Sequence, residues 1–185
     1  MLVACEDEVA TAPDARSSDD GSGAHFPVTA DEVVTPIAIE PLSARHQFTD
    51  DFSAQFRLKP DGRPMAVVNL QGASRLAVLK ITVQPGARFP WHTHPGPVLV
   101  AITQGELVYT YADDCIERNY PSGTALVDPG TNVHYAYNPT SAETVLIATF
   151  FGVPAAGPLT IPVTSEAGAG YDSKCSVAPA VMGSH

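Results

Sequence analysis

Basic residues are scarce in this sequence. Its 185 residues include ten Lys and Arg against twenty Asp and Glu, so the formal net charge is -10. A protein of this charge repels phosphate backbones and anionic membrane surfaces. We therefore expect no nucleic-acid partner, and membrane association only through a possible lipid anchor.

Long apolar helices are also missing. Residues 144–165 carry no charge and are numerous enough to cross a bilayer as a helix. However, Gly152, Pro154, Pro158 and Pro162 interrupt the stretch. Two strands separated by a Pro/Gly turn fit it better than a transmembrane helix.

Motifs for nucleophilic catalysis and phosphate binding are absent: there is no P-loop, no GxGxxG and no Ser-His-Asp pattern. The chain instead has 17 Pro and 14 Gly, which indicate many turns and few long helices. Short apolar or alternating runs such as LAVLKITV, PVLVAIT, ELVYTYA and NVHYAYN recur about every ten residues. This pattern predicts an all-β sandwich or barrel, with one short helix allowed between Pro41 and Phe56.

The N-terminal residues differ in composition from the rest. Residues 1–24 hold half of the net charge and have no apolar periodicity, which is typical of a disordered acidic linker. Leu2-Val3-Ala4-Cys5 resembles the lipobox at which bacterial lipoprotein precursors are cleaved, and this resemblance implies lipidation of Cys5. An accidental match of four residues is the alternative.

Three histidines form the candidate site. His92 and His94 lie two residues apart, so on an extended strand their imidazoles share a face. His134 adds a donor from a distant segment. Three converging imidazoles suit one divalent transition metal ion, namely Fe, Cu, Zn, Ni or Mn. The alternative is a set of hydrogen-bonded histidines that bind nothing.

Both histidine segments resemble the cupin superfamily. The fixed positions of its first motif are matched by Gly86, His92, His94 and Gly105, and those of its second by Gly123, Pro129, His134 and Asn138, with Thr131 in place of a Gly. The resemblance implies a single jelly-roll β-barrel over residues 65–163, preceded by a lead-in segment (25–64) and followed by a C-terminal tail (164–185). Dimers are common in the family, so a homodimer is possible.

The departure from the family pattern is at its acidic ligand. Val98 stands where the first motif has Glu, so we expect a site without a carboxylate. Three neutral imidazoles leave the charge of a divalent ion uncompensated and favour a small anionic ligand. Val98 and Val100 are the candidate substrate contacts. Simple core packing is the alternative for both.

The aromatic residues are assigned mainly to packing. Phe89 and Trp91 are expected on the face opposite the His92 and His94 imidazoles. Four tyrosines are read as sheet formers, any of which could donate a proton: Tyr109, Tyr111, Tyr135 and Tyr137.

The three cysteines are Cys5, Cys115 and Cys175. With Cys5 lipidated, the other two make one pair, and a disulfide between them would fix the tail to a hairpin loop. Two unrelated thiols are the alternative. A disulfide would agree with a location outside the cytoplasm.

These patterns and the resemblance together favour a metal-dependent cupin that acts on a small molecule outside the cytoplasm. The leading expectation is an enzyme resembling non-haem dioxygenases, in which His92, His94 and His134 hold the ion. The alternatives are a non-catalytic module that binds a metal or small ligand, and a structural cupin with a vestigial site.

Overall fold

The computed structural model describes residues 36–60, 62–70 and 75–177. The predictions for residues 1–24, including Cys5 as a lipidated residue, lie outside the described residues.

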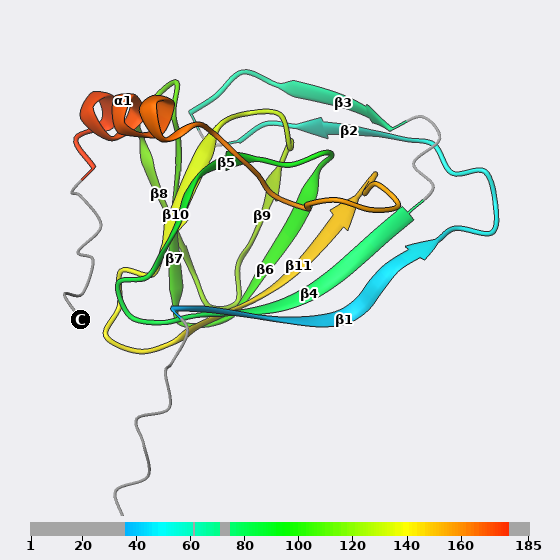
Figure 1. Cartoon of the computed structure of the whole chain (residues 1–185), viewed down its shortest axis with the longest axis horizontal. Helices are drawn as coiled ribbons and strands as arrows, with labels where there is room; N and C mark the ends of the chain where they lie inside the picture. The colour runs from blue at the N-terminus through cyan, green and yellow to red at the C-terminus, as the bar shows by residue number, and fades with distance from the viewer. Residues whose placement is uncertain (1–35, 61, 71–74, 178–185) are drawn as a thin grey trace, which may run out of the picture. The chain divides into compact units, whose positions relative to one another are not determined.

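Two five-stranded antiparallel sheets face each other (Figure 1). The first contains, in spatial order, β1 (Ile37–Gln47), β4 (Arg75–Val83), β11 (Thr144–Phe151), β6 (Val98–Gln104) and β9 (Ala125–Asp128). The second contains β12 (Ile161–Pro162), β5 (Arg88–Thr93), β10 (His134–Tyr137), β7 (Glu106–Tyr111) and β8 (Glu117–Pro121). A separate hairpin joins β2 (Ala54–Leu58) to β3 (Ala66–Leu70). The expected all-β jelly-roll fold is confirmed.

The core lies between the two sheets because the strands alternate. On β4, every second side chain from Ala77 to Val83 is buried, and on β11 the same holds for Leu146, Ala148 and Phe150. This alternation gives each strand one apolar face, and burying that face removes about 25 cal/mol of unfavourable hydration per Å².

The short helix allowed between Pro41 and Phe56 is wrong, because that segment forms β1 and β2. β1 is an edge strand paired with β4, and the register shifts after Pro41. A proline has no N–H for a ladder bond, so an edge strand with a register shift can hold it.

Both segments that flank the expected barrel carry regular structure. β1 belongs to the first sheet, so the sheet begins before residue 65. The expected tail contains helix α1 (Ser165–Cys175), in which the Thr164 side chain accepts a hydrogen bond from the Ala167 N–H. No side chain of α1 is buried, so the sequence shows no apolar periodicity from which this helix could be predicted.

The uncharged stretch of residues 144–165 contains β11 and β12. Within the part of the chain that the structure describes, no helix is long and apolar enough to span a membrane.

Candidate metal centre

The three predicted histidines meet at one place on the second sheet. His92 on β5 pairs directly with His134, the first residue of β10, and His94 follows the end of β5. One ring nitrogen from each can be chosen so that all three lie within 4.8 Å of one another. The pairing of β5 with β10 therefore brings together residues about 40 positions apart in the sequence.

A close approach of two loops positions His94. Its backbone N–H donates to the carbonyl oxygen of Gly130 at 2.7 Å. Gly130 has φ of 95°, and a Cβ at this position would collide with the carbonyl oxygen of Gly96. Only glycine meets both conditions, which explains why Gly130 precedes Thr131 here.

The imidazoles are oriented by the backbone. A carbonyl oxygen is only an acceptor, so a ring nitrogen beside it carries the proton, and the other nitrogen of a neutral ring presents its lone pair. The three Nδ1 atoms lie beside Pro90 O for His92 (2.6 Å), Leu159 O for His94 (2.8 Å) and Asn132 O for His134 (2.9 Å). All three Nε2 atoms are therefore available as ligands.

Burial keeps two of the rings neutral. It lowers the pKa of His92 to about 3, assisted by the neighbouring His134 and His94. Burial likewise lowers the pKa of His134 to about 3, against a raising effect of its bond to Asn132. Near neutral pH these two rings are unprotonated, as metal binding requires.

Among the described residues the candidate metal-binding set consists of three imidazoles, as expected, but a buried carboxylate lies beside it. Asp128, the last residue of β9, is 1% exposed, and its Oδ2 lies 3.1 Å from Nε2 of His134 and 3.6 Å from Nε2 of His94. Burial raises the pKa of Asp128, opposed by His94 and by the Gly130 N–H. Sequence reasoning examined only the motif position at Val98 and missed an acid on the neighbouring strand.

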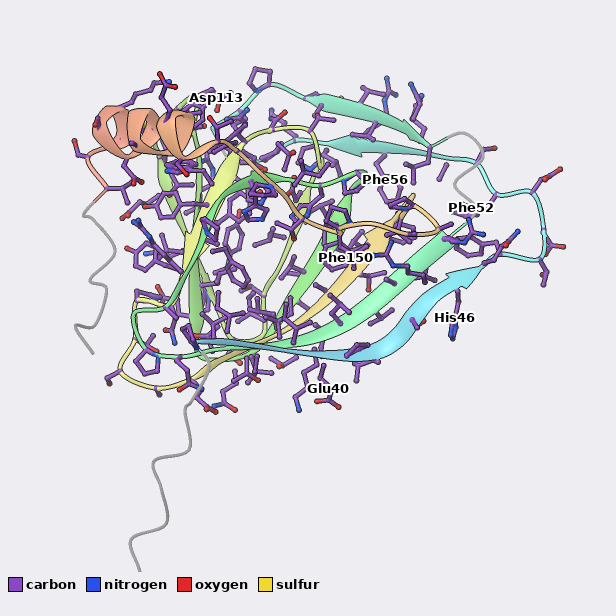
Figure 2. The ribbon with its side chains drawn as sticks, in the orientation of Figure 1. Glu40, His46, Phe52, Phe56, Asp113 and Phe150 are labelled. Carbon is purple, nitrogen blue, oxygen red and sulfur yellow. A yellow bond between two sulfur atoms is a disulfide. The ribbon has the colours of Figure 1, made fainter. Side chains whose placement is uncertain are left out.

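A cavity of about 720 Å³ adjoins the three imidazoles. Val98 and Val100, the predicted substrate contacts, both line it. Most of its remaining wall is apolar and includes Ala77, Leu79, Ile81, Leu107, Leu146 and Phe150. Figure 2 shows Phe150 between the two sheets, and its ring centroid lies 5.4 Å from that of His94.

The two aromatic residues of β5, Phe89 and Trp91, lie on different sides of the strand. Trp91 lies on the far side from the cavity, where its ring contacts Tyr135 and Tyr171 and its Nε1–H donates to Asp172 at 2.8 Å. The prediction for Phe89 is wrong, because it lines the cavity together with His92. The register of β5 against β10 shifts between Phe89 and His92. Because of this shift, side chains on β5 do not alternate strictly between the two faces of the sheet.

Tyr109 is distinguished from the other three tyrosines because it alone lines the cavity. Its ring stacks on His134 at 4.7 Å between centroids, and its buried hydroxyl has no hydrogen-bond partner among the described residues. Burial, followed by the nearby Asp128 carboxylate, raises the pKa of Tyr109 well above its ordinary value. The hydroxyl is therefore protonated at neutral pH.

The loop between β11 and β12 borders the cavity with Pro158, Leu159 and Thr160. Arg45 of β1 donates to two carbonyl oxygens of this loop, those of Pro154, at 2.7 Å, and of Gly157. The loop thus contacts the site through the Leu159 carbonyl and the opposite edge of the first sheet through Arg45. The sequence held no signal for either contact.

A disulfide joins Cys115, in the turn after β7, to Cys175 at the end of α1. Lys174 reinforces this attachment by donating to the carbonyl oxygens of Ala112 and Asp113. These contacts hold α1 beside the second sheet (Figure 1).

The fold and the site define a β-barrel protein with a buried three-histidine cluster suited to a metal ion. Residues 79–150 match the Cupin_2 family model, described as a cupin domain. This match confirms the resemblance drawn from the two motifs. No curated protein matches the chain.

Several solved structures are similar to the chain. One is the Cupin_2 domain of an XRE family transcriptional regulator from Enterobacter cloacae, with a TM-score of 0.44 and 15% identity over 65% of this chain and 99% of that one. A cupin superfamily protein from Desulfitobacterium hafniense has a TM-score of 0.36 and 14% identity over 56% of this chain and 81% of that one. An oxalate oxidase has a TM-score of 0.40 and 16% identity over 56% and 65% of the respective chains.

Proposed function

We propose that this protein is a metal-dependent cupin enzyme, resembling non-haem dioxygenases, that acts on a small molecule with an apolar body and an anionic head. One observation carries the proposal. One ring nitrogen from each of the three histidines lies within 4.8 Å of the others beside a largely apolar cavity, while every Nδ1 atom faces a backbone carbonyl.

The donor set fits a divalent transition ion. Three lone pairs directed at one another repel unless a cation or protons lie between them, and imidazole suits Fe, Cu, Zn and Ni. His92, His94 and His134 would hold the ion, which when bound would supply a Lewis acid and a template for the substrate.

The chain's own groups define what the cavity accepts. Its aliphatic wall binds an apolar body and excludes water from the site. An anionic head, such as an enolate, carboxylate or thiolate, would be attracted to the ion. The Tyr109 hydroxyl lines the cavity and stays protonated at neutral pH, so it can donate a hydrogen bond to the bound molecule.

We also propose that the protein works outside the cytoplasm and is attached to the bacterial membrane through a lipid on Cys5. The disulfide between Cys115 and Cys175 supports this location, since such bonds persist in oxidising compartments.

Metal content is the first test. Protein purified without added metal should contain about one divalent transition ion per chain, and His134→Gln should lose most of it. His46→Gln is the matched control, because His46 is exposed on β1 and points away from the two sheets (Figure 2). Equal occupancy in the wild type and His134→Gln would refute the site.

Turnover is the second test. Oxygen consumption is measured against enols, diketones and thiols that carry aliphatic substituents. Turnover that depends on the metal supports the enzyme. Tight ligand binding without any turnover would instead identify a non-catalytic binding module.

A further inference from the structure

The unexplained group at the centre is the Asp128 carboxylate. Its Oδ1 accepts a hydrogen bond from the Gly130 N–H at 2.6 Å. Its Oδ2 is buried and has no hydrogen-bond partner among the described residues. An unpartnered buried oxygen of this kind costs about 1 to 3 kcal/mol, more when it is charged, so its surroundings must provide a compensating group.

The Tyr109 hydroxyl is close enough to lower the pKa of Asp128, but the two ring nitrogens that lie beside Oδ2 do not provide such a group. Nε2 of His134 lies 3.1 Å away and Nε2 of His94 lies 3.6 Å away. With their Nδ1 atoms protonated, these nitrogens are acceptors, as is an ionised carboxylate. A proton on one of these nitrogens would form a hydrogen bond between that nitrogen and Oδ2 only. A cation would interact with the lone pairs of both nitrogens and of Oδ2 at once. Atoms bound to the same ion at about 2.0 to 2.2 Å are separated by roughly 3 to 3.5 Å, close to the distances found here.

Asp128 lies directly across from the position at which the cupin motif has Glu. Strands β6 and β9 pair so that Val98 lies directly opposite Asp128, and both residues line the cavity. Val98 occupies the motif position at which the cupin pattern places Glu. A carboxylate can therefore reach the centre from the neighbouring strand.

We propose that Asp128 is a fourth protein ligand of the metal ion, supplied by β9 in place of the acid absent from β6. The inference rests on the proposed metal centre. It makes the donor set three imidazoles and one carboxylate, a combination suited to Fe, Mn, Co, Ni or Zn. It also leaves a divalent ion with one uncompensated positive charge, which favours a monoanionic head over a dianionic one.

Titration with Co2+ alone tests the inference in the full chain. Calorimetry gives the affinity, and the visible absorption of Co2+ reports its ligands. Asp128→Asn keeps the size of the side chain and removes the charge. We expect at least about a 100-fold loss of affinity together with a changed spectrum, because residues that only orient a ligand typically cost about 10- to 100-fold. Asp113→Asn is the matched control, since its exposed carboxylate pairs with Arg63.

Stability of the metal-free protein separates a ligand from a structural partner. If Asp128 only paired with a protonated histidine, Asp128→Asn would lower the melting temperature without metal and leave the Co2+ spectrum unchanged. As a ligand, its replacement should leave that temperature unchanged or raise it. The double variant Val98→Glu/Asp128→Asn, which returns the acid to β6, should regain at least tenfold of the lost affinity.

The outcomes are distinct. A wild-type protein that binds no Co2+ contradicts the proposed metal centre itself. A wild-type protein that binds Co2+, with Asp128→Asn unchanged in spectrum or less than tenfold weaker, overturns only the role of Asp128. Should Asp128→Asn fail to fold, infrared spectra of wild-type protein labelled with 13C-aspartate decide, since Co2+ must then shift one carboxylate stretch.

Discussion

The stability of the metal-free protein should fall steeply below neutral pH because of two buried imidazoles. His92 and His134 have pKa values of about 3 in the folded protein, against 6.5 for an ordinary histidine. Between these values the unfolded chain binds protons that the folded chain does not. Stability is therefore complete above the unfolded pKa and is lost as the pH falls through this window.

The size of the effect follows from the unfolded pKa. Between pH 7 and pH 5, each imidazole should lower the free energy of unfolding by about 2 kcal/mol, so the pair should lower it by about 4 kcal/mol. The raised pKa of Asp128 acts in the opposite sense, because a carboxyl that binds protons more readily when folded gains stability as pH falls. The lowered pKa of Asp114, about 2, acts below this window.

Urea unfolding with a chelator present, at pH 7, 6 and 5, measures this loss. Trp91 is the only tryptophan and reports unfolding through its fluorescence. His134→Gln should lose about 2 kcal/mol less than the wild type over the same interval, and His46→Gln should behave as the wild type does. Equal losses in the wild type and His134→Gln would refute the reasoning. His92→Gln provides the same comparison if His134→Gln does not fold.

Three further predictions concern the disulfide and the cavity. Non-reducing peptide mapping of protein from its native compartment should recover Cys115 and Cys175 as one cross-linked pair. Reduction of this 60-residue link should lower stability by up to about 4 kcal/mol, and two free thiols would remove the support for export. Val98→Glu should lower the melting temperature of the metal-free protein, because it buries a second carboxylate opposite Asp128 at a cost of about 2 kcal/mol or more. Adding Zn2+ should restore the melting temperature. A variant that Zn2+ does not restore would show that position 98 does not face the ion. Tyr109→Phe should leave the melting temperature unchanged or raised, since it removes a buried hydroxyl without a hydrogen-bond partner among the described residues. Turnover should fall, and unchanged turnover would exclude this hydroxyl as a hydrogen-bond donor to the substrate.

The sequence by itself determined the class of fold and the three histidines. Strand alternation and turn residues are local properties, so β4, β6, β7 and β11 could be predicted from short runs such as LAVLKITV and TVLIATFF. The two cupin motifs have fixed spacings, and these identified His92, His94 and His134 although the last lies 40 residues beyond His94.

Tertiary structure alone decided what surrounds those histidines. Asp128 reaches the centre because β9 pairs with β6 in a register that sets it opposite Val98, and no local pattern determines a pairing between strands 30 residues apart. Phe89 lines the cavity because of a register shift. Leu159 acts through its backbone carbonyl, which any residue would supply, and the Arg45 side chain donates to a loop more than 100 residues away in the sequence. Periodicity reports which face of a strand is buried, whereas the neighbours across that face depend on register, bulges and loop paths that exist only in the folded chain.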